Sequence, residues 1–452
     1  MNPLLRRIQI VYPIFTNKIY KQWYNSQTKQ RYFSQFINER PIPFKKMFEQ
    51  PRSSQTDYST DVNSKYRYWK KLSAKPNPQT SGLPFTLVSY NILAQDLLLQ
   101  HIYLYRQSNQ LYLRWSYRSA RITEKIIQQK PDIICLQEVQ ENHLDDIMTS
   151  IRSQMPSMSC LFKKKTGPKS DGCAIIYNNK LFELILQDVV EFFRPDIQLL
   201  DRHNIALIAK FRCKARKEAN FVVSTTHLLF NPRRQDVRLA QIMVLLAELD
   251  RHSIVKPGKL DRMPCIVTGD FNLQANSAPF QLITTGKLCY ENLAKTSLSE
   301  SGAYGLPLTG KNFISHQLRI TDNCQHIDCV ESDYKNCPQQ IPIKDKHPNH
   351  STLFATGTLS HELNLRSAYD HFDGMSYGSI FQNGWVTVDH IFYSKAKKKQ
   401  RSPKNGTLQL LSVYQLPTMK QCRAIGILPN EEHGSDHLIL AARFYLKFPI
   451  IE

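Results

Sequence analysis

Short apolar runs alternate with amphipathic stretches from Phe85 almost to the end of the chain. The runs are brief and rich in β-branched residues, which is typical of buried strands and too short for core helices. They are FTLVSYNIL (85–93), DIICLQEV (132–139), NFVVSTTHLLF (220–230), PCIVTGDF (264–271), VTVDHIFYS (386–394) and HLILAARFYL (437–446).

Apolar residues recur at helical spacing between these runs. The first two predicted helices carry them at Ile122, Ile126 and Ile127, and then at Leu144, Ile147, Met148 and Ile151. A third helix is predicted to open at Asn231-Pro232, a capping residue followed by proline at the first helical position. Its apolar positions are Val237, Ile242, Val244, Leu245 and Leu246. Strands and helices mixed throughout one long region favour a layered α/β fold.

The N-terminal part of the chain differs in composition. Residues 1–84 are predicted to be a basic leader and linker, largely disordered, ahead of a catalytic domain at 85–452. Residues 1–80 hold fifteen Lys and Arg against four Asp and Glu, about half of the total net charge of +21. Residues 1–38 contain no acidic residue and resemble a mitochondrial transit peptide, with a cleavage-like site at 31–34. The alternative is a basic arm on a cytoplasmic protein. The excess of positive charge suits a polyanionic partner such as nucleic acid.

Several other features narrow the possible classes of protein. No run of apolar residues is long enough for a membrane span. Ten scattered cysteines are typical of an intracellular protein with reduced thiols. Cys324, His326, Cys329 and Cys337 could supply zinc ligands, but their spacing is not standard, so a loop with incidental cysteines is favoured. The polar stretch 274–380 predicts a long loop that is functional or partly disordered.

Acid, amide and imidazole side chains lie at or near the ends of the apolar strands at six places. They are Asn91, Glu138, His227, Asp270 with Asn272, Asp389, and Asp436 with His437. Each alone could be an ordinary polar strand end, but buried charges are costly unless they are paired or bind a metal. Hydrolysis of a phosphate ester needs this set, because carboxylates hold Mg²⁺ while neutral donors contact phosphoryl oxygens. No glycine-rich phosphate loop, GxSxG elbow or Cys-His nucleophile pair indicates another chemistry.

The segments SYNIL, LQEV, THL, GDFN, VDHIFYS and GSDHL, in this order, resemble the signature of the endonuclease/exonuclease/phosphatase superfamily. Longer stretches are similar to its deadenylase-related branch, which contains nocturnin, and most of all to the Angel group. They are SYNILAQDLL (89–98), RWSYR (114–118), EFFRPDIQLLDR (191–202) and HLLFNPRRQDVRLAQ (227–241). The resemblance covers roughly residues 85–446. It implies a four-layer α/β/β/α sandwich with the active site where strand ends converge.

The resemblance also implies roles for individual residues. Glu138 would be the main Mg²⁺ ligand (Mn²⁺ could substitute), with Asn91 beside it and Asp436 at a second metal. Asp270 would orient or deprotonate the attacking water, and Asn272 and His227 would contact phosphoryl oxygens. His437 would stabilise the transition state, with Asp389 fixing its tautomer. The implied substrate-binding residues are Arg233, Arg234, Asn204 and Trp385.

Two positions depart from the family pattern. His390 replaces a tyrosine, and it should face away from Asp389 because neighbouring side chains on a strand alternate. Gly384 replaces an aromatic residue that stacks on adenine in poly(A)-specific relatives. Trp385 is either a substitute stacking platform or a core residue. Preference for poly(A) therefore stays open.

The sequence thus predicts an Mg²⁺-dependent phosphoesterase acting on RNA 3′ ends. Two activities fit: hydrolysis of a 2′,3′-cyclic phosphate, attributed to the Angel group, and 3′–5′ exonucleolysis, including deadenylation. The alternatives are a DNA-repair nuclease, a lipid or inositol phosphatase of the same fold, or a catalytically silent RNA-binding module. Residues 1–84 show no leucine-rich repeat, so no docking to a deadenylase scaffold through such repeats is expected.

Overall fold

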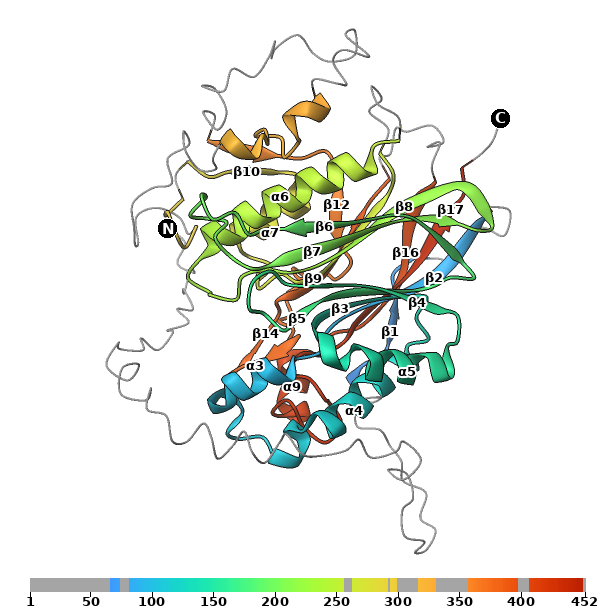
Figure 1. The fold of residues 1–452 in the computed structure, drawn as a ribbon, viewed down its shortest axis with the longest axis vertical. Coiled ribbons are helices and arrows are strands. Elements are labelled where there is room, and N and C mark those ends of the chain that lie inside the picture. Colours follow the sequence, from blue (N-terminus) through green and yellow to red (C-terminus); the bar gives the residue numbers. More distant parts are fainter. Residues whose placement is uncertain are drawn as a thin grey trace, which may run out of the picture. The chain divides into compact units, whose positions relative to one another are not determined.

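Two mixed β-sheets packed face to face form the centre of the fold (Figure 1). The computed structural model describes residues 66–73, 81–255, 262–291, 293–298, 316–330, 357–396 and 406–449. Helices cover the outer face of each sheet, so the layers run helix, sheet, sheet, helix. This arrangement confirms the predicted four-layer α/β/β/α sandwich.

The first sheet has seven strands. Their order across the sheet is β1 (Trp69–Lys71), β16 (Thr407–Tyr414), β17 (Leu440–Lys447), β2 (Gly82–Asn91), β3 (Ile133–Gln140), β5 (Asp171–Asn178) and β4 (Met158–Lys164). Strands β2 and β3 are parallel, and the other neighbours are antiparallel. The carboxyl ends of β2 and β3 therefore lie side by side.

The second sheet has six strands. Their order is β12 (Leu365–Ser367), β15 (Asp389–Ser394), β9 (Cys265–Asp270), β8 (Arg216–His227), β7 (Ile205–Cys213) and β6 (Phe182–Glu191). Here β8 and β9 are the parallel pair. Two short antiparallel pairs stand outside the sheets. One is the hairpin of β13 (Ile380–Phe381) and β14 (Trp385–Val386), and the other joins β10 (Lys287–Cys289) to the distant β11 (Thr358–Ser360).

Strand alternation divides the apolar side chains between the layers. In β2, Phe85 and Leu87 lie in the core between the sheets, while Val88 and Tyr90 face the helices of the first sheet. The inter-sheet core is rich in aromatic rings, and Phe221 of β8 contacts Phe85 across it with ring centroids 5.6 Å apart. Each central strand is thus buried on both faces, which explains its nearly continuous apolar sequence.

Four helices supply most of the outer layers. Helices α4 (Trp115–Gln128) and α5 (Leu144–Gln154) cover the first sheet, and α6 (Gln235–Ser253) and α7 (Ala278–Thr285) cover the second. A further short helix, α3 (Gln95–Gln100), follows β2, and α9 (Met419–Ile425) precedes β17. Within the described residues, no helix has the length and apolar character needed to cross a bilayer.

The third predicted helix begins later than expected. The Oδ1 atom of Asn231 accepts from the backbone N–H of Arg233 at 3.0 Å, and its carbonyl accepts from Arg234 N–H at 3.1 Å. These bonds close a turn at 231–234, so α6 starts only at Gln235. The start at Asn231-Pro232 was therefore wrong, because the asparagine side chain stabilises a turn instead of capping the helix.

Part of the predicted linker belongs to the first sheet. Strand β1 pairs with β16, and the buried Arg67 donates from Nη2 to the carbonyl of Ile439 at 2.6 Å. The prediction of a linker is wrong for residues 66–73 and 81–84, because main-chain pairing and one buried guanidinium hold them. The predicted transit peptide at 1–33 lies outside the described residues, and the division of the chain at residue 84 stays a prediction.

The polar stretch 274–380 is described at 274–291, 293–298, 316–330 and 357–380. Cys324 is buried in the core beneath α6, and His326 Nε2 lies 3.1 Å from Glu248 Oε1. Cys337 lies outside the described residues. Cys324 therefore packs in the core, and His326 pairs with Glu248.

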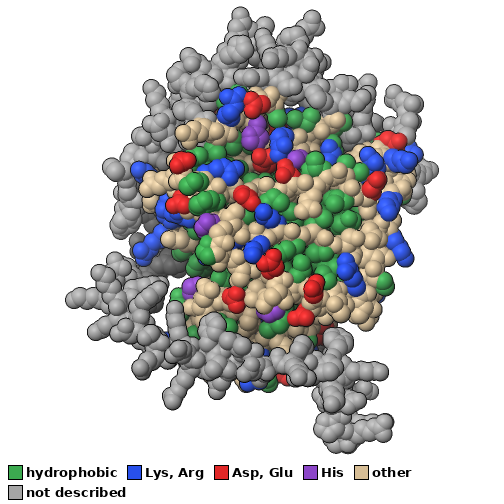
Figure 2. Space-filling model, viewed as in Figure 1, with side chains coloured by type: hydrophobic (Ala, Val, Ile, Leu, Met, Phe, Trp, Pro, Cys, Tyr) green, Lys and Arg blue, Asp and Glu red, His purple; other side chains and the backbone are tan. Residues whose placement is uncertain are grey.

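Charge is mixed on the face shown in Figure 2, where Lys and Arg side chains are interspersed with Asp and Glu. Among the residues that the structure describes, Lys and Arg thus form no continuous basic surface on this face.

Candidate active site

The predicted site residues meet at one end of the two sheets. Asn91 ends β2, Glu138 lies near the end of β3, and His227 and Asp270 end the parallel strands β8 and β9, where they are direct partners. Asp389 begins the antiparallel strand β15 and pairs with Asp270 from the other side. His437, just before β17, completes the set, so each sheet contributes part of the site.

A bulge in β3 turns Glu138 toward the site. In regular alternation Ile134 and Leu136 face the helices, and Glu138 would follow them. The pairing of β3 with β5 shifts between Gln137 and Val139, and Glu138 adopts a φ of 56°. Val139 then takes the position facing the helices. A left-handed non-glycine residue costs on the order of 1 kcal/mol, which is common at functional sites.

Asn91 joins the two sheets at the site. Its Nδ2 atom donates to Glu138 Oε1 and to Asp270 Oδ2, both at 3.0 Å. Its Oδ1 atom accepts from the backbone N–H of Leu93 at 3.0 Å. The second Glu138 oxygen accepts from Ala94 N–H at 3.0 Å. The amide therefore holds two carboxylates close together, at the position where the sequence predicted a metal ligand.

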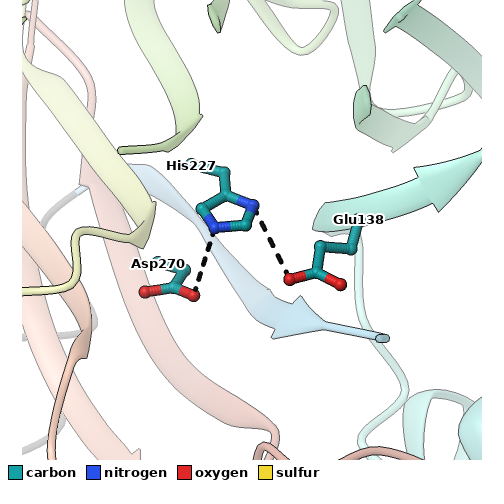
Figure 3. A group of neighbouring side chains, drawn as sticks. All are labelled: Glu138, His227 and Asp270. Atoms are coloured by element: carbon teal, nitrogen blue, oxygen red, sulfur yellow. Dashed lines mark ion pairs between the residues drawn. The ribbon is translucent and has the colours of Figure 1, made fainter. Parts of the chain in front are cut away.

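Glu138, His227 and Asp270 form a cluster with the spacing of metal ligands (Figure 3). His227 lies between the two acids, with Nδ1 3.8 Å from Glu138 Oε1 and Nε2 3.6 Å from Asp270 Oδ2. Burial, together with the nearby Asp171 carboxylate, raises the pKa of Glu138. Burial also raises the pKa of Asp270 to about 7, against the opposing effect of His437. A divalent cation fits this donor set, because it would offset the buried negative charge.

Asp389 and His437 form a hydrogen-bonded pair beside this cluster. His437 Nδ1 lies 2.9 and 3.0 Å from the two oxygens of Asp389, which leaves Nε2 facing Asp270 Oδ2 at 3.7 Å. Burial alone would lower the pKa of His437, but Asp389, Asp436 and Asp270 hold it well above its usual range. These carboxylates favour the protonated form of His437, in which an N–H on Nε2 would be directed at Asp270.

The other predicted residues lie around this centre. Asp436 Oδ2 accepts from the hydroxyl of Tyr105 at 2.8 Å, and Asn272 Nδ2 donates to the Leu228 carbonyl at 3.2 Å. Asn204 donates from Nδ2 to the backbone carbonyl of His227 at 2.9 Å. Asp436 Oδ1 also lies 3.9 Å from His437 Nε2, so all three residues lie at the site, and their catalytic roles stay predictions.

The remaining substrate-binding candidates are more peripheral. Arg233 is exposed, while Arg234 pairs with the buried Asp236 at 2.9 Å. Trp385 lies on the hairpin beside Gly384 and packs edge-on against Phe381, with centroids 5.7 Å apart. His390 is buried and its Nε2 bonds the Leu273 carbonyl at 2.7 Å, which confirms that it faces away from Asp389.

The structure adds buried site residues that the sequence did not indicate. The Arg118 guanidinium, fully buried, donates to the carbonyls of Ile92, Leu93 and Gly434 and so ties the loop after β2 to the loop before His437. Ser379 donates to Asp389 Oδ2 at 2.6 Å. Lys165 also belongs to this group, with Nζ 3.2 Å from His227 Nδ1. Lys165 and Arg118 are cations, and only their contacts in the fold distinguish them from surface residues. The RWSYR stretch was a usable signal for Arg118.

Comparison with known proteins agrees with this geometry. The family model for the endonuclease/exonuclease/phosphatase family matches residues 88–437, and the chain belongs to this family. Family and site together identify a phosphoester hydrolase. Its relatives include protein angel homolog 2 of Homo sapiens, 35% identical over 398 residues, which cover 84% of this chain and 72% of that protein. Protein angel of Drosophila melanogaster is 34% identical over 363 residues, 80% of each chain. The predicted resemblance to the Angel group is confirmed.

A solved structure is similar over the same region. The crystal structure of ANGEL2, a 2′,3′-cyclic phosphatase, has 34% sequence identity and a TM-score of 0.69, and the match covers 85% of this chain and 99% of that chain. The same protein in complex with adenosine-2′,3′-vanadate matches with the same identity and TM-score, over 84% of this chain.

Proposed function

We propose that the protein hydrolyses the 2′,3′-cyclic phosphate at RNA 3′ ends with the help of Mg²⁺. The observation that carries the proposal is the joining of two buried groups, Glu138–His227–Asp270 and Asp270–Asp389–His437, through one carboxylate. The likeness to ANGEL2, a 2′,3′-cyclic phosphatase solved with adenosine-2′,3′-vanadate, supports the substrate. The alternative activity, 3′–5′ exonucleolysis, would use the same centre.

Glu138 would hold the cation, with Asp436 as a second candidate ligand. The cation would supply Lewis-acid stabilisation of the phosphoryl charge. Burial suits Glu138 to this role, because its carboxylate has little solvent to stabilise it. Asn91 keeps Glu138 and Asp270 at a fixed separation by donating to both.

Asp270 is suited to take a proton from the attacking water, because a pKa of about 7 makes it a stronger base than an ordinary aspartate. Attack forms a new P–O bond and breaks the bond between phosphorus and one ribose oxygen. The proton that water loses ends on the ribose hydroxyl that is released. His437, held through Nδ1 by Asp389, presents Nε2–H to the phosphoryl oxygen on which charge develops.

The test uses the full chain with Mg²⁺ and 5′-labelled RNA oligonucleotides. One set ends in a 2′,3′-cyclic phosphate, and matched sets end in oligoadenylate or oligouridylate with a free 3′-hydroxyl. Loss of the cyclic phosphate at unchanged chain length supports the proposal. A ladder of shortened products would instead indicate an exonuclease, and faster loss of oligoadenylate would make it a deadenylase. Inactivity of Glu138→Ala excludes a contaminating nuclease.

A further inference from the structure

A buried lysine contacts His227 at Nδ1, the ring nitrogen that does not face Asp270. Lys165 follows β4, and its Nζ atom lies 2.6 Å from Asp171 Oδ2 and 3.2 Å from His227 Nδ1. Both members of the ion pair are buried, with side chains 7% and 1% exposed. Asp171 begins β5, so the pair is anchored in the first sheet while His227 ends a strand of the second.

The chemistry of lysine restricts the imidazole. An ammonium group has three donors and no acceptor, so a hydrogen bond from Lys165 requires an unprotonated Nδ1 on His227. In the opposite tautomer, with the proton on Nδ1, the N–H would point at the ammonium and place two donors 3.2 Å apart, which is unfavourable. A neutral His227 in this position therefore carries its proton on Nε2, the atom that faces Asp270.

We infer that Lys165 fixes His227 as a hydrogen-bond donor into the site. With Nδ1 occupied by Lys165 and Nε2 protonated, neither ring nitrogen offers a lone pair. His227 then contacts a phosphoryl oxygen through Nε2–H and is neither a metal ligand nor a general base. The inference rests on the proposed phosphoesterase function for the identity of the contacted group. It leaves Glu138, and not His227, to hold the cation at the Glu138–His227–Asp270 cluster.

The tautomer can be measured without substrate. In the full chain with ¹⁵N-labelled histidine, the two ring nitrogens of a neutral imidazole give separate NMR signals, and loss of one set in His227→Gln assigns it. We expect the Nε2–H form in the wild type. The double variant Lys165→Met/Asp171→Asn removes the ion pair without leaving a buried charge, and it should lose the fixed tautomer. Lys164→Met, which removes an exposed lysine paired with Glu141, is the matched control.

Two further measurements complete the test. Mn²⁺ binding by calorimetry should be retained in His227→Leu and lost in Glu138→Gln. The double variant should lower kcat on the cyclic phosphate by about 10- to 100-fold, the usual effect of a residue that orients a site group. An Nδ1–H tautomer in the wild type, or loss of Mn²⁺ binding in His227→Leu as large as in Glu138→Gln, would overturn the inference. If wild-type protein fails to hydrolyse the RNA, the proposed function fails while the tautomer assignment stands.

Discussion

Replacing Asp270 with asparagine should stabilise the metal-free protein at alkaline pH. Burial raises the pKa of Asp270 from 3.8 to about 7. Folding therefore takes up a proton between these values, and stability falls as the pH rises through this window. Each pKa unit corresponds to about 1.4 kcal/mol, so the buried carboxylate costs up to about 4 kcal/mol at pH 8. Asparagine avoids this cost.

The Asp270→Asn variant also loses a hydrogen bond. Asn91 Nδ2 now donates to Asp270 Oδ2, and an amide with its nitrogen there would place two donors together. Losing that bond costs about 1 kcal/mol, which leaves a net gain of about 3 kcal/mol at pH 8 and a small loss near pH 4. Urea unfolding in EDTA at both pH values measures the difference. A difference between wild type and variant that does not change with pH would refute the reasoning.

Four other changes have defined outcomes. Glu138→Gln should abolish Mg²⁺ binding in calorimetry and hydrolysis in the RNA assay; turnover that still depends on Mg²⁺ would reject its role. Ser379→Ala removes the hydrogen bond to Asp389 and should lower kcat about tenfold with little change in KM; a tenfold rise in KM as well would indicate that the whole site is disturbed. Gly269→Ala should destabilise by about 3 kcal/mol or more in urea unfolding, because φ is +144° and an added Cβ would lie 2.0 Å from a backbone oxygen. Removing residues 1–80 deletes Arg67 and β1 and should cost about 2 kcal/mol or more in the same assay; an unchanged midpoint would contradict this.

The fold was largely predictable because its central strands are buried on both faces. Such strands read as continuous apolar runs, and all six predicted runs are strands. Strand β6 was missed because only two of its ten residues are fully buried and Glu183, Gln187 and Asp188 interrupt the apolar pattern. Strands β5 and β7 were also missed. Their sequences are short apolar runs like those of the predicted strands, so they could have been predicted in the same way. Strand β1 has only three residues, too few for any periodicity.

The centre of the site was predictable for a different reason. Burying an acidic side chain at the end of an apolar strand costs free energy unless it is paired or binds a metal. The positions of these residues therefore indicated a common functional site. The supporting residues carried no such signal. Lys165 stands in a run of three lysines, two of which form exposed surface pairs. Only the fold shows that the third is buried against Asp171. Tyr105 reaches Asp436 from a segment 331 positions earlier in the chain, which no local pattern can reveal.

The proposed catalytic groups are divided between two sheets that share no strand. Glu138 belongs to the seven-stranded sheet and Asp270 to the six-stranded sheet, and the Asn91–Asp270 hydrogen bond spans the junction. Under the proposed function, catalysis would depend on the alignment of the sheets as much as on the folding of each. That alignment is set by the aromatic core between them, around Phe221. A substitution in this core that left both sheets intact would still act on the chemistry, by changing the distance between the two carboxylates.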